Sequence, residues 1–276
     1  MKRCGIFLIL IFLCFSISAQ DESGDGGIAE TLFHHVMDSQ EFAPFPFLPA
    51  IPLPMGITVH LLMLFLATIL ILSVFLSIFR KPGLKPKGLK ISLEILILFV
   101  RDDIVYPVMG EKRGEKWLPF FSTLFIYLLV INYLGLIPAF KTATGNFTVT
   151  SSLALMILVL MVIIGFKNLG FIKFFKNYYP EGVSKPIGLF VALLEFIGTF
   201  IRIVVLSLRL FANMFAGHLA ILAFLLLMFM LNPAFGIVSV PFTVFTFALE
   251  VLVALIQAMV FTLLSCIFIT MSSQSH

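Results

Sequence analysis

The sequence predicts an all-α integral membrane protein with about five membrane helices and one amphipathic helix at the membrane interface. The 276 residues are 61% hydrophobic and only 12% charged, and the mean hydropathy is +1.14, which excludes a soluble globule with a polar surface. Several apolar runs are long enough to cross hydrocarbon as helices. Alternating ten-residue strands, which would predict a membrane barrel, are absent from the sequence.

The charged residues predict the orientation of the chain. Lys and Arg concentrate in residues 80–116 and 167–185, the positive-inside pattern of cytoplasmic loops. Residues 21–41 are acidic and contain neither Lys nor Arg, which suits the opposite side. The formal charge of +4 therefore reports topology, and no nucleic-acid partner is expected. The prediction is a multi-pass protein of a bacterial inner membrane, with the mature N-terminus outside and the C-terminus in the cytoplasm.

Residues 1–19 are typical of a cleavable signal peptide. A basic start, a short apolar run and small residues precede the polar stretch QDESGDG, with cleavage after Ala19 or Ser18. An uncleaved anchor is the alternative. Cleavage would remove Cys4 and Cys14 and leave Cys266, so no intrachain disulfide would then be possible.

Residues 20–56 are predicted to form an extracytoplasmic N-terminal segment, because their prolines discourage a long helix. The membrane domain is then 57–276. A largely apolar first span ends on basic Arg80, residues 91–110 are amphipathic and too charged to span, and 141–150 form a short outer loop. The predicted spans are 57–79, 118–140, 151–166, 187–231 and 235–271.

The last two spans are longer than a perpendicular crossing requires, so each must tilt steeply, bend or divide in two. The preferred interpretation is two long tilted helices in an antiparallel hairpin. Gly188, Gly198 and Gly217 are compatible with close packing of a continuous helix.

Ionisable and amide side chains lie inside these two apolar runs, where they are expensive and usually mark a pathway or pair with each other. Glu195, Arg202 and Arg209 are seven residues apart each time, so they share one helical stripe, which Asn213 joins. His218 points to the opposite face. The second run carries Glu250 and Gln257.

An antiparallel hairpin places His218 level with Glu250 and Arg209 level with Gln257, about 14 Å deeper by helical rise. Equal depth is not proof of contact. Imidazole and carboxylate groups exchange protons near neutral pH, whereas arginine stays charged, so the first pair suits a proton path and Arg209 an electrostatic gate. The alternative is that His218 and Glu250 only pair with each other in a packed hairpin, while the Arg209 side chain reaches toward water. For Arg202, a structural role is as plausible as a functional one.

The sequence predicts no catalytic site and no cofactor, since it contains neither a phosphate-binding loop nor a nucleophile elbow. His34, His35 and His60 form a weak metal signal without nearby Cys, and no metal is expected.

The chain resembles the subunit a family of F-type ATP synthases. The motifs that carry the resemblance are LSLRLFANMFAGHL at 206–219, INYLGLIP at 131–138, Glu195 at its fixed spacing and EVLVALIQAMVFTLLSCIFITMSS at 250–273. By this resemblance Arg209 matches the essential arginine, Asn213 its companion amide and Gln257 the neighbouring glutamine. His218 and Glu250 occupy the two access positions that many bacterial members fill in the opposite order.

The resemblance implies a stator subunit that works with a c-subunit ring, a b-subunit stalk and the rest of the synthase, in the lipid bilayer, and that is not catalytic alone. Protons would reach the c-subunit carboxylate through a half-channel at His218 and Glu250 and leave through a second one near Glu195, with Arg209 between them. A self-contained ion antiporter or channel is the alternative function. It would need an acid level with Arg209, which this chain lacks. A structural membrane anchor would leave the polar ladder unexplained.

Overall fold

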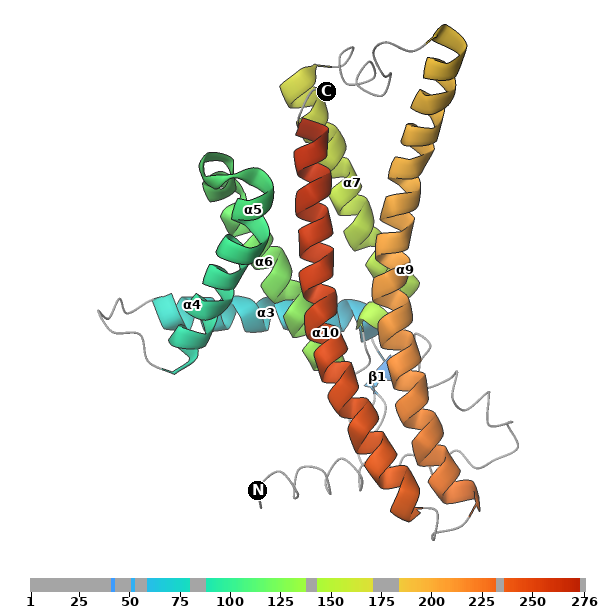
Figure 1. Ribbon diagram of the computed structural model, residues 1–276. Helices are drawn as coiled ribbons and strands as arrows, with labels where there is room; N and C mark the ends of the chain where they lie inside the picture. Colours follow the sequence, from blue (N-terminus) through green and yellow to red (C-terminus); the bar gives the residue numbers. More distant parts are fainter. Residues whose placement is uncertain are drawn as a thin grey trace. The chain divides into compact units, whose positions relative to one another are not determined.

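The computed structural model describes residues 41–42, 51–52, 59–79, 88–137, 143–170, 184–231 and 236–273. In this part of the chain the fold is all-α (Figure 1), apart from one antiparallel pair of two-residue strands, β1 (Glu41–Phe42) and β2 (Ile51–Pro52). The helices are α3 (Val59–Phe79), α4 (Leu89–Phe99), the π-helical turn η2 (Val100–Val105), α5 (Tyr106–Met109), α6 (Glu111–Gly135), the 3₁₀ turn η3 (Ala143–Gly145), α7 (Phe147–Leu169), α9 (Lys185–Leu231) and α10 (Gly236–Ser273).

Five of these helices, α3, α6, α7, α9 and α10, are long and apolar enough to cross a membrane. The prediction of a multi-pass helical membrane protein is therefore confirmed. Large apolar side chains on their outer faces are exposed in the isolated chain, for example Leu189 at 70%. In a membrane such side chains meet lipid or a partner helix, so their exposure does not conflict with the fold.

Helices α6 and α7 begin seven and four residues before the predicted spans, and α9 begins two residues before its predicted span. Helix α6 begins at Glu111, directly after Gly110, whose φ of 73° ends α5. Helix α7 begins at Phe147 within the stretch predicted as an outer loop. Its early polar residues do not interrupt the helix, because the hydroxyls of Thr150, Ser151 and Ser152 donate to carbonyls three residues earlier.

The predicted signal peptide at 1–19 lies outside the described residues, as does most of the N-terminal segment 20–56. The chain divides into two compact units. Unit 1 comprises Met1–Ser73, Leu129–Asn146 and Ala212–Leu255, and unit 2 comprises Val74–Leu128, Phe147–Phe211 and Ile256–His276.

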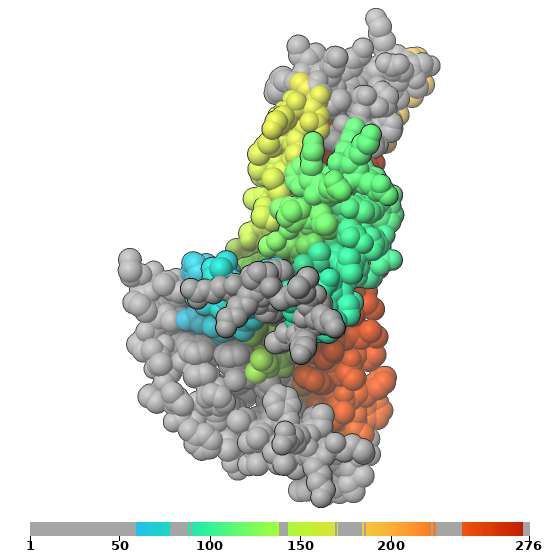
Figure 2. All heavy atoms as spheres, turned by 90° about the vertical axis from the view of Figure 1, so that its left-hand side faces the viewer, coloured from blue at the N-terminus to red at the C-terminus, as the bar shows by residue number. Residues whose placement is uncertain are grey.

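Unit 2 contains the segment predicted as an amphipathic helix. Residues 91–110 fall in α4, η2 and α5, which pack against α6 through the rings of Phe99 and Phe125, 5.9 Å apart (Figure 2, green). Gly114 allows this close approach, because a Cβ there would lie 2.8 Å from the Tyr106 ring. On the surface, the Arg101 guanidinium bonds to Asp102 at 2.7 Å and lowers the pKa of that carboxyl.

Unit 1 contains the second half of α9 and the first half of α10, which run antiparallel (Figure 1). The hydroxyl of Ser239 donates to the carbonyl oxygen of Phe224, and the rings of Phe224 and Phe242 stack with centroids 5.7 Å apart. These contacts confirm the hairpin interpretation for the two halves. The C-terminal end of α6, the turn η3, the strands β1 and β2 and the first part of α3 also belong to this unit.

Candidate functional site

The predicted site residues lie on two helices and in both units. Helix α9 carries Glu195, Arg209, Asn213 and His218, and helix α10 carries Glu250 and Gln257. Unit 1 contains His218, Glu250 and Asn213; unit 2 contains Arg209, Gln257 and Glu195. Each group is described within its own unit.

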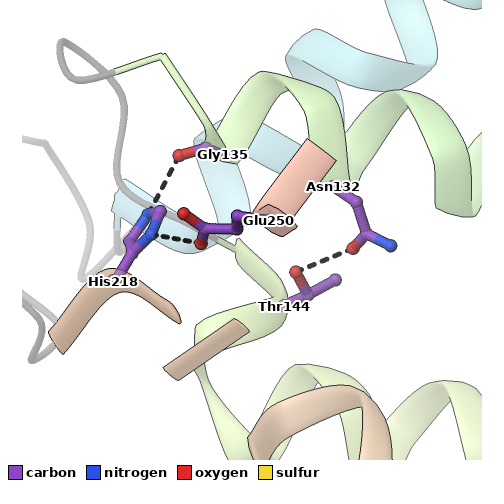
Figure 3. A network of polar contacts seen from close by, with 5 residues as sticks. All are labelled: Asn132, Gly135, Thr144, His218 and Glu250. Atoms are coloured by element: carbon purple, nitrogen blue, oxygen red, sulfur yellow. Dashed lines mark hydrogen bonds and ion pairs between the residues drawn. The ribbon is translucent and has the colours of Figure 1, made fainter. Parts of the chain in front are cut away.

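In unit 1, His218 and Glu250 are in direct contact. The Nδ1 atom of His218 lies 2.8 Å from Oε1 of Glu250 (Figure 3). The Glu250 side chain is almost fully buried, at 3% exposure, and His218 is at 23%. Equal depth in the hairpin predicted the level of the two residues but not this contact.

The second ring nitrogen of His218 contacts the C-terminal end of α6. Nε2 lies 3.0 Å from the carbonyl oxygen of Gly135, one of the last carbonyls of a helix, which have no partner inside it. The two preceding carbonyls, of Tyr133 and Leu134, accept from the N–H groups of Leu136 and Ile137 in tight 3₁₀-type bonds. His218 thus caps α6 from another helix.

Gly217 makes room for the carboxylate. A Cβ added there would lie 2.8 Å from Oε1 of Glu250, 2.9 Å from Cδ and 3.2 Å from Cγ. Only a residue without a side chain allows Glu250 to lie against the α9 backbone. The sequence had indicated Gly217 as a packing residue, and the structure identifies the carboxyl group that it accommodates.

A neighbouring polar group was not predicted as part of the site. The Asn132 amide on α6 accepts a hydrogen bond from Thr144 Oγ1 at 3.0 Å and donates to the carbonyl oxygen of Ala254 on α10 at 3.4 Å (Figure 3). Asn132 and Thr144 are both fully buried. The sequence could have indicated Asn132 as a site residue, because it is an amide side chain inside an apolar span. Thr144 lies in the turn η3, within the stretch 141–150 predicted as an outer loop, and the residues of this turn are buried.

In unit 2, Arg209 is exposed on α9, and Gln257 is buried on α10 at 2% exposure. No carboxylate of the described residues lies within ion-pair distance of the Arg209 guanidinium. Glu195 is half-buried, and its backbone carbonyl accepts from the Thr199 hydroxyl at 3.0 Å. Arg202, one stripe position from Arg209, is also exposed.

Within the described ranges, no group of three or more His, Cys, Asp or Glu could hold a metal ion. His34 and His35 lie outside these ranges. His60 is buried on α3, at 2% exposure.

Comparison with known proteins identifies the family of the chain. The family model described as "ATP synthase A chain" matches residues 61–270. ATP synthase subunit a of Chlorobium phaeobacteroides is 37% identical over 264 residues, covering 91% of this chain and 77% of that protein. The corresponding subunit of Myxococcus xanthus is 39% identical over 224 residues, covering 80% and 74%. ATP synthase subunit a 2 of Chlorobaculum tepidum is 35% identical over 275 residues, covering 94% and 76%.

The matched region contains all of the helices that carry the polar ladder, apart from the last three residues of α10. This range is more than half of the chain, and each of these relatives is more than 30% identical over more than two thirds of both proteins. The chain therefore belongs to the ATP synthase subunit a family.

Proposed function

We propose that this chain is the proton-translocating stator subunit of an F-type ATP synthase in a bacterial inner membrane. It is not catalytic alone; it provides two offset half-channels to a carboxylate on the c-subunit ring, and Arg209 is the gate between them. Membership of the family supports the stator role. The b-subunit stalk and the remaining subunits complete the complex.

The observation that best supports Arg209 as the gate is the environment of its guanidinium. Its guanidinium is exposed on α9, and only 11% of the most apolar stretch of this helix is buried inside the chain. Among the described residues, no carboxylate pairs with Arg209. A charged side chain at the centre of a bilayer costs about 2.5–3.5 kcal/mol or more. A carboxylate on another chain, facing the exposed side of α9, would offset this cost.

Each remaining site residue has a place in the path. Protons from the outside reach the ring through His218 and Glu250, which share a hydrogen bond at 2.8 Å. The ring carboxylate becomes neutral and can turn toward lipid, and it loses its proton to the cytoplasm near Glu195. Asn213, four residues after Arg209 on the same helical stripe, and Gln257 provide the amides that accompany Arg209.

Arg209 favours the ionised ring carboxylate because an opposite charge stabilises the charged form. A dry bidentate pair would be difficult to break at each step. The exposed position of Arg209 suits a hydrated and loose contact.

ATP-driven proton pumping by inverted membrane vesicles tests this function. Arg202→Ala is the matched control for Arg209→Ala, since both residues are exposed arginines on α9, seven residues apart. We expect Arg209→Ala to abolish pumping and Arg202→Ala to retain most of it, with both complexes assembled to the wild-type level. Wild-type pumping by Arg209→Ala would refute the gate, and equal loss in both variants would refute the assignment of the gate to Arg209.

A further inference from the structure

The hydrogen bonds of His218 determine which of its nitrogens carries a proton. Nε2 lies 3.0 Å from the Gly135 carbonyl oxygen. A carbonyl oxygen only accepts hydrogen bonds, so Nε2 must be the donor and must carry N–H. Backbone geometry therefore selects the tautomer of the neutral ring.

The contact with Glu250 fixes the number of protons on the pair. Nδ1 and Oε1 lie 2.8 Å apart, and one of the two must donate. Either the imidazole is doubly protonated beside a carboxylate, or the neutral imidazole accepts from a carboxylic acid. Both forms hold one proton more than a neutral ring beside an ionised carboxylate. A hydrogen bond between these two atoms (Figure 3), with Nε2 as N–H, therefore requires one shared proton between Nδ1 and Oε1.

We propose that the Gly135 carbonyl is a positioning group that assigns separate roles to the two nitrogens of His218. Nε2 keeps its proton throughout, and Nδ1 alone exchanges a proton with Oε1 of Glu250. One proton arriving from outside changes the charge of the pair from −1 to 0, and the same proton leaving restores −1. The exchange within the pair stands on the geometry, and its part in transport rests on the proposed function.

The surroundings of His218 suit this role. From α10 the facing titratable group is Glu250, and from α6 the facing group is the Gly135 carbonyl at the C-terminal end of the helix. The neighbouring Asn132 and Thr144 are neutral and bond to each other.

Release of the proton requires the contact to open. Without the shared proton, lone pairs on Nδ1 and Oε1 would face each other at 2.8 Å. The ring cannot relieve this by moving its proton from Nε2 to Nδ1, because Nε2 would then present a lone pair to the Gly135 carbonyl. The buried Oε2 of Glu250 has no hydrogen-bond partner among the described residues. The carboxylate therefore moves when it is ionised, and proton release is coupled to separation of the pair.

Nitrogen-15 NMR of histidine-labelled ATP synthase in membranes tests the assignment. The His218 signals are identified by their loss in the His218→Gln complex. We expect Nε2 to remain protonated at every pH at which the complex stays assembled, while Nδ1 gains and loses its proton. A neutral ring protonated at Nδ1, or titration at Nε2, would overturn the proposal.

A backbone substitution tests the carbonyl itself. Replacing Leu136 by its α-hydroxy acid turns the Gly135–Leu136 peptide bond into an ester, whose carbonyl is a weaker acceptor, and removes the N–H that bonds to Tyr133. The same change at Ile137 is the matched control, since it removes the equivalent N–H to Leu134 but keeps the Gly135 amide. We expect the ester at 136 to mix the two tautomers and to lower ATP-driven pumping about threefold more than the ester at 137.

Equal NMR spectra for the two ester complexes would overturn the role of Gly135. Failure of the proposed function has a different signature. A His218→Gln complex that pumps at the wild-type rate would remove His218 from the proton path and would leave the assignment of its nitrogens in place.

Discussion

Substituting Gly217 by Ala perturbs the His218–Glu250 contact without removing either group. A Cβ at this position would lie 2.8 Å from Glu250 Oε1, whereas ordinary contacts of a Cβ begin at 3.4 Å. The carboxylate must then retreat by about 0.6 Å, the difference between these two distances. Added along the 2.8 Å contact with Nδ1, this retreat brings the hydrogen bond to about 3.4 Å, beyond its usual range.

Loss of a hydrogen bond to a charged group removes about 1.5–3 kcal/mol, which is tenfold or more in the population of the paired state. We therefore expect Gly217→Ala to reduce ATP-driven proton pumping by about tenfold, measured in inverted vesicles at equal content of assembled complex. Glu250→Asp in the same background shortens the side chain by one methylene and should restore part of the pumping.

Gly198→Ala is the matched control on the same helix. Its Cβ would meet only Arg202 Nη2, at 3.9 Å, an ordinary contact, and alanine is the better helix former. Pumping by Gly198→Ala should equal that of the wild type. The reasoning is refuted if Gly217→Ala also pumps at the wild-type rate, or if the two alanine variants lose pumping equally.

Three further outcomes are expected. Asn132→Ala leaves the buried Thr144 hydroxyl without its amide partner, so the complex should unfold at a lower temperature, by about 1–3 kcal/mol of stability, and an unchanged melting curve would contradict the role of this amide. A cysteine at exposed Leu208 should form a disulfide with a cysteine placed next to the ring carboxylate of the c subunit, whereas one at buried Leu206 should not, in a background without native cysteines. The reverse pattern would place the ring on another face. Arg101 lowers the pKa of Asp102, so their ion pair stabilises the fold at pH values above the ordinary carboxyl pKa, and this stabilisation is lost as the pH falls through the lowered pKa. The melting temperatures of Asp102→Asn and wild type should therefore converge in acid. A difference in melting temperature that grows in acid would contradict the lowered pKa.

The sequence predicted the helices and the equal level of His218 and Glu250, because both follow from patterns along the chain. Apolar length gives membrane spans, and antiparallel pairing gives equal depth for His218 and Glu250. The hydrogen bond between these residues needed the rotation of each helix about its axis, which helical spacing alone does not determine.

The contacts of the Gly135 carbonyl and of the Thr144 hydroxyl could not be predicted from the sequence pattern. The partner of His218 Nε2 is a backbone carbonyl, that of Gly135, and every residue has one. Thr144 lies in a stretch of small and polar residues that is typical of an exposed loop, yet its hydroxyl is buried against Asn132. Tertiary packing decided this burial, because the hydroxyl satisfies an amide that would otherwise be costly inside an apolar span.

The most direct test of the gate is passive proton conduction through membranes from which the ATP-hydrolysing part of the synthase has been removed. In such vesicles the c ring and this chain remain, and no ATP-driven step contributes to the proton flux. Our account predicts that Arg209→Ala conducts protons at least as fast as the wild type although ATP-driven pumping is lost, because the two half-channels are then no longer separated by a fixed positive charge. Passive conduction that disappears together with pumping, in a fully assembled complex, would contradict the account and would make Arg209 part of the conducting path rather than the barrier within it.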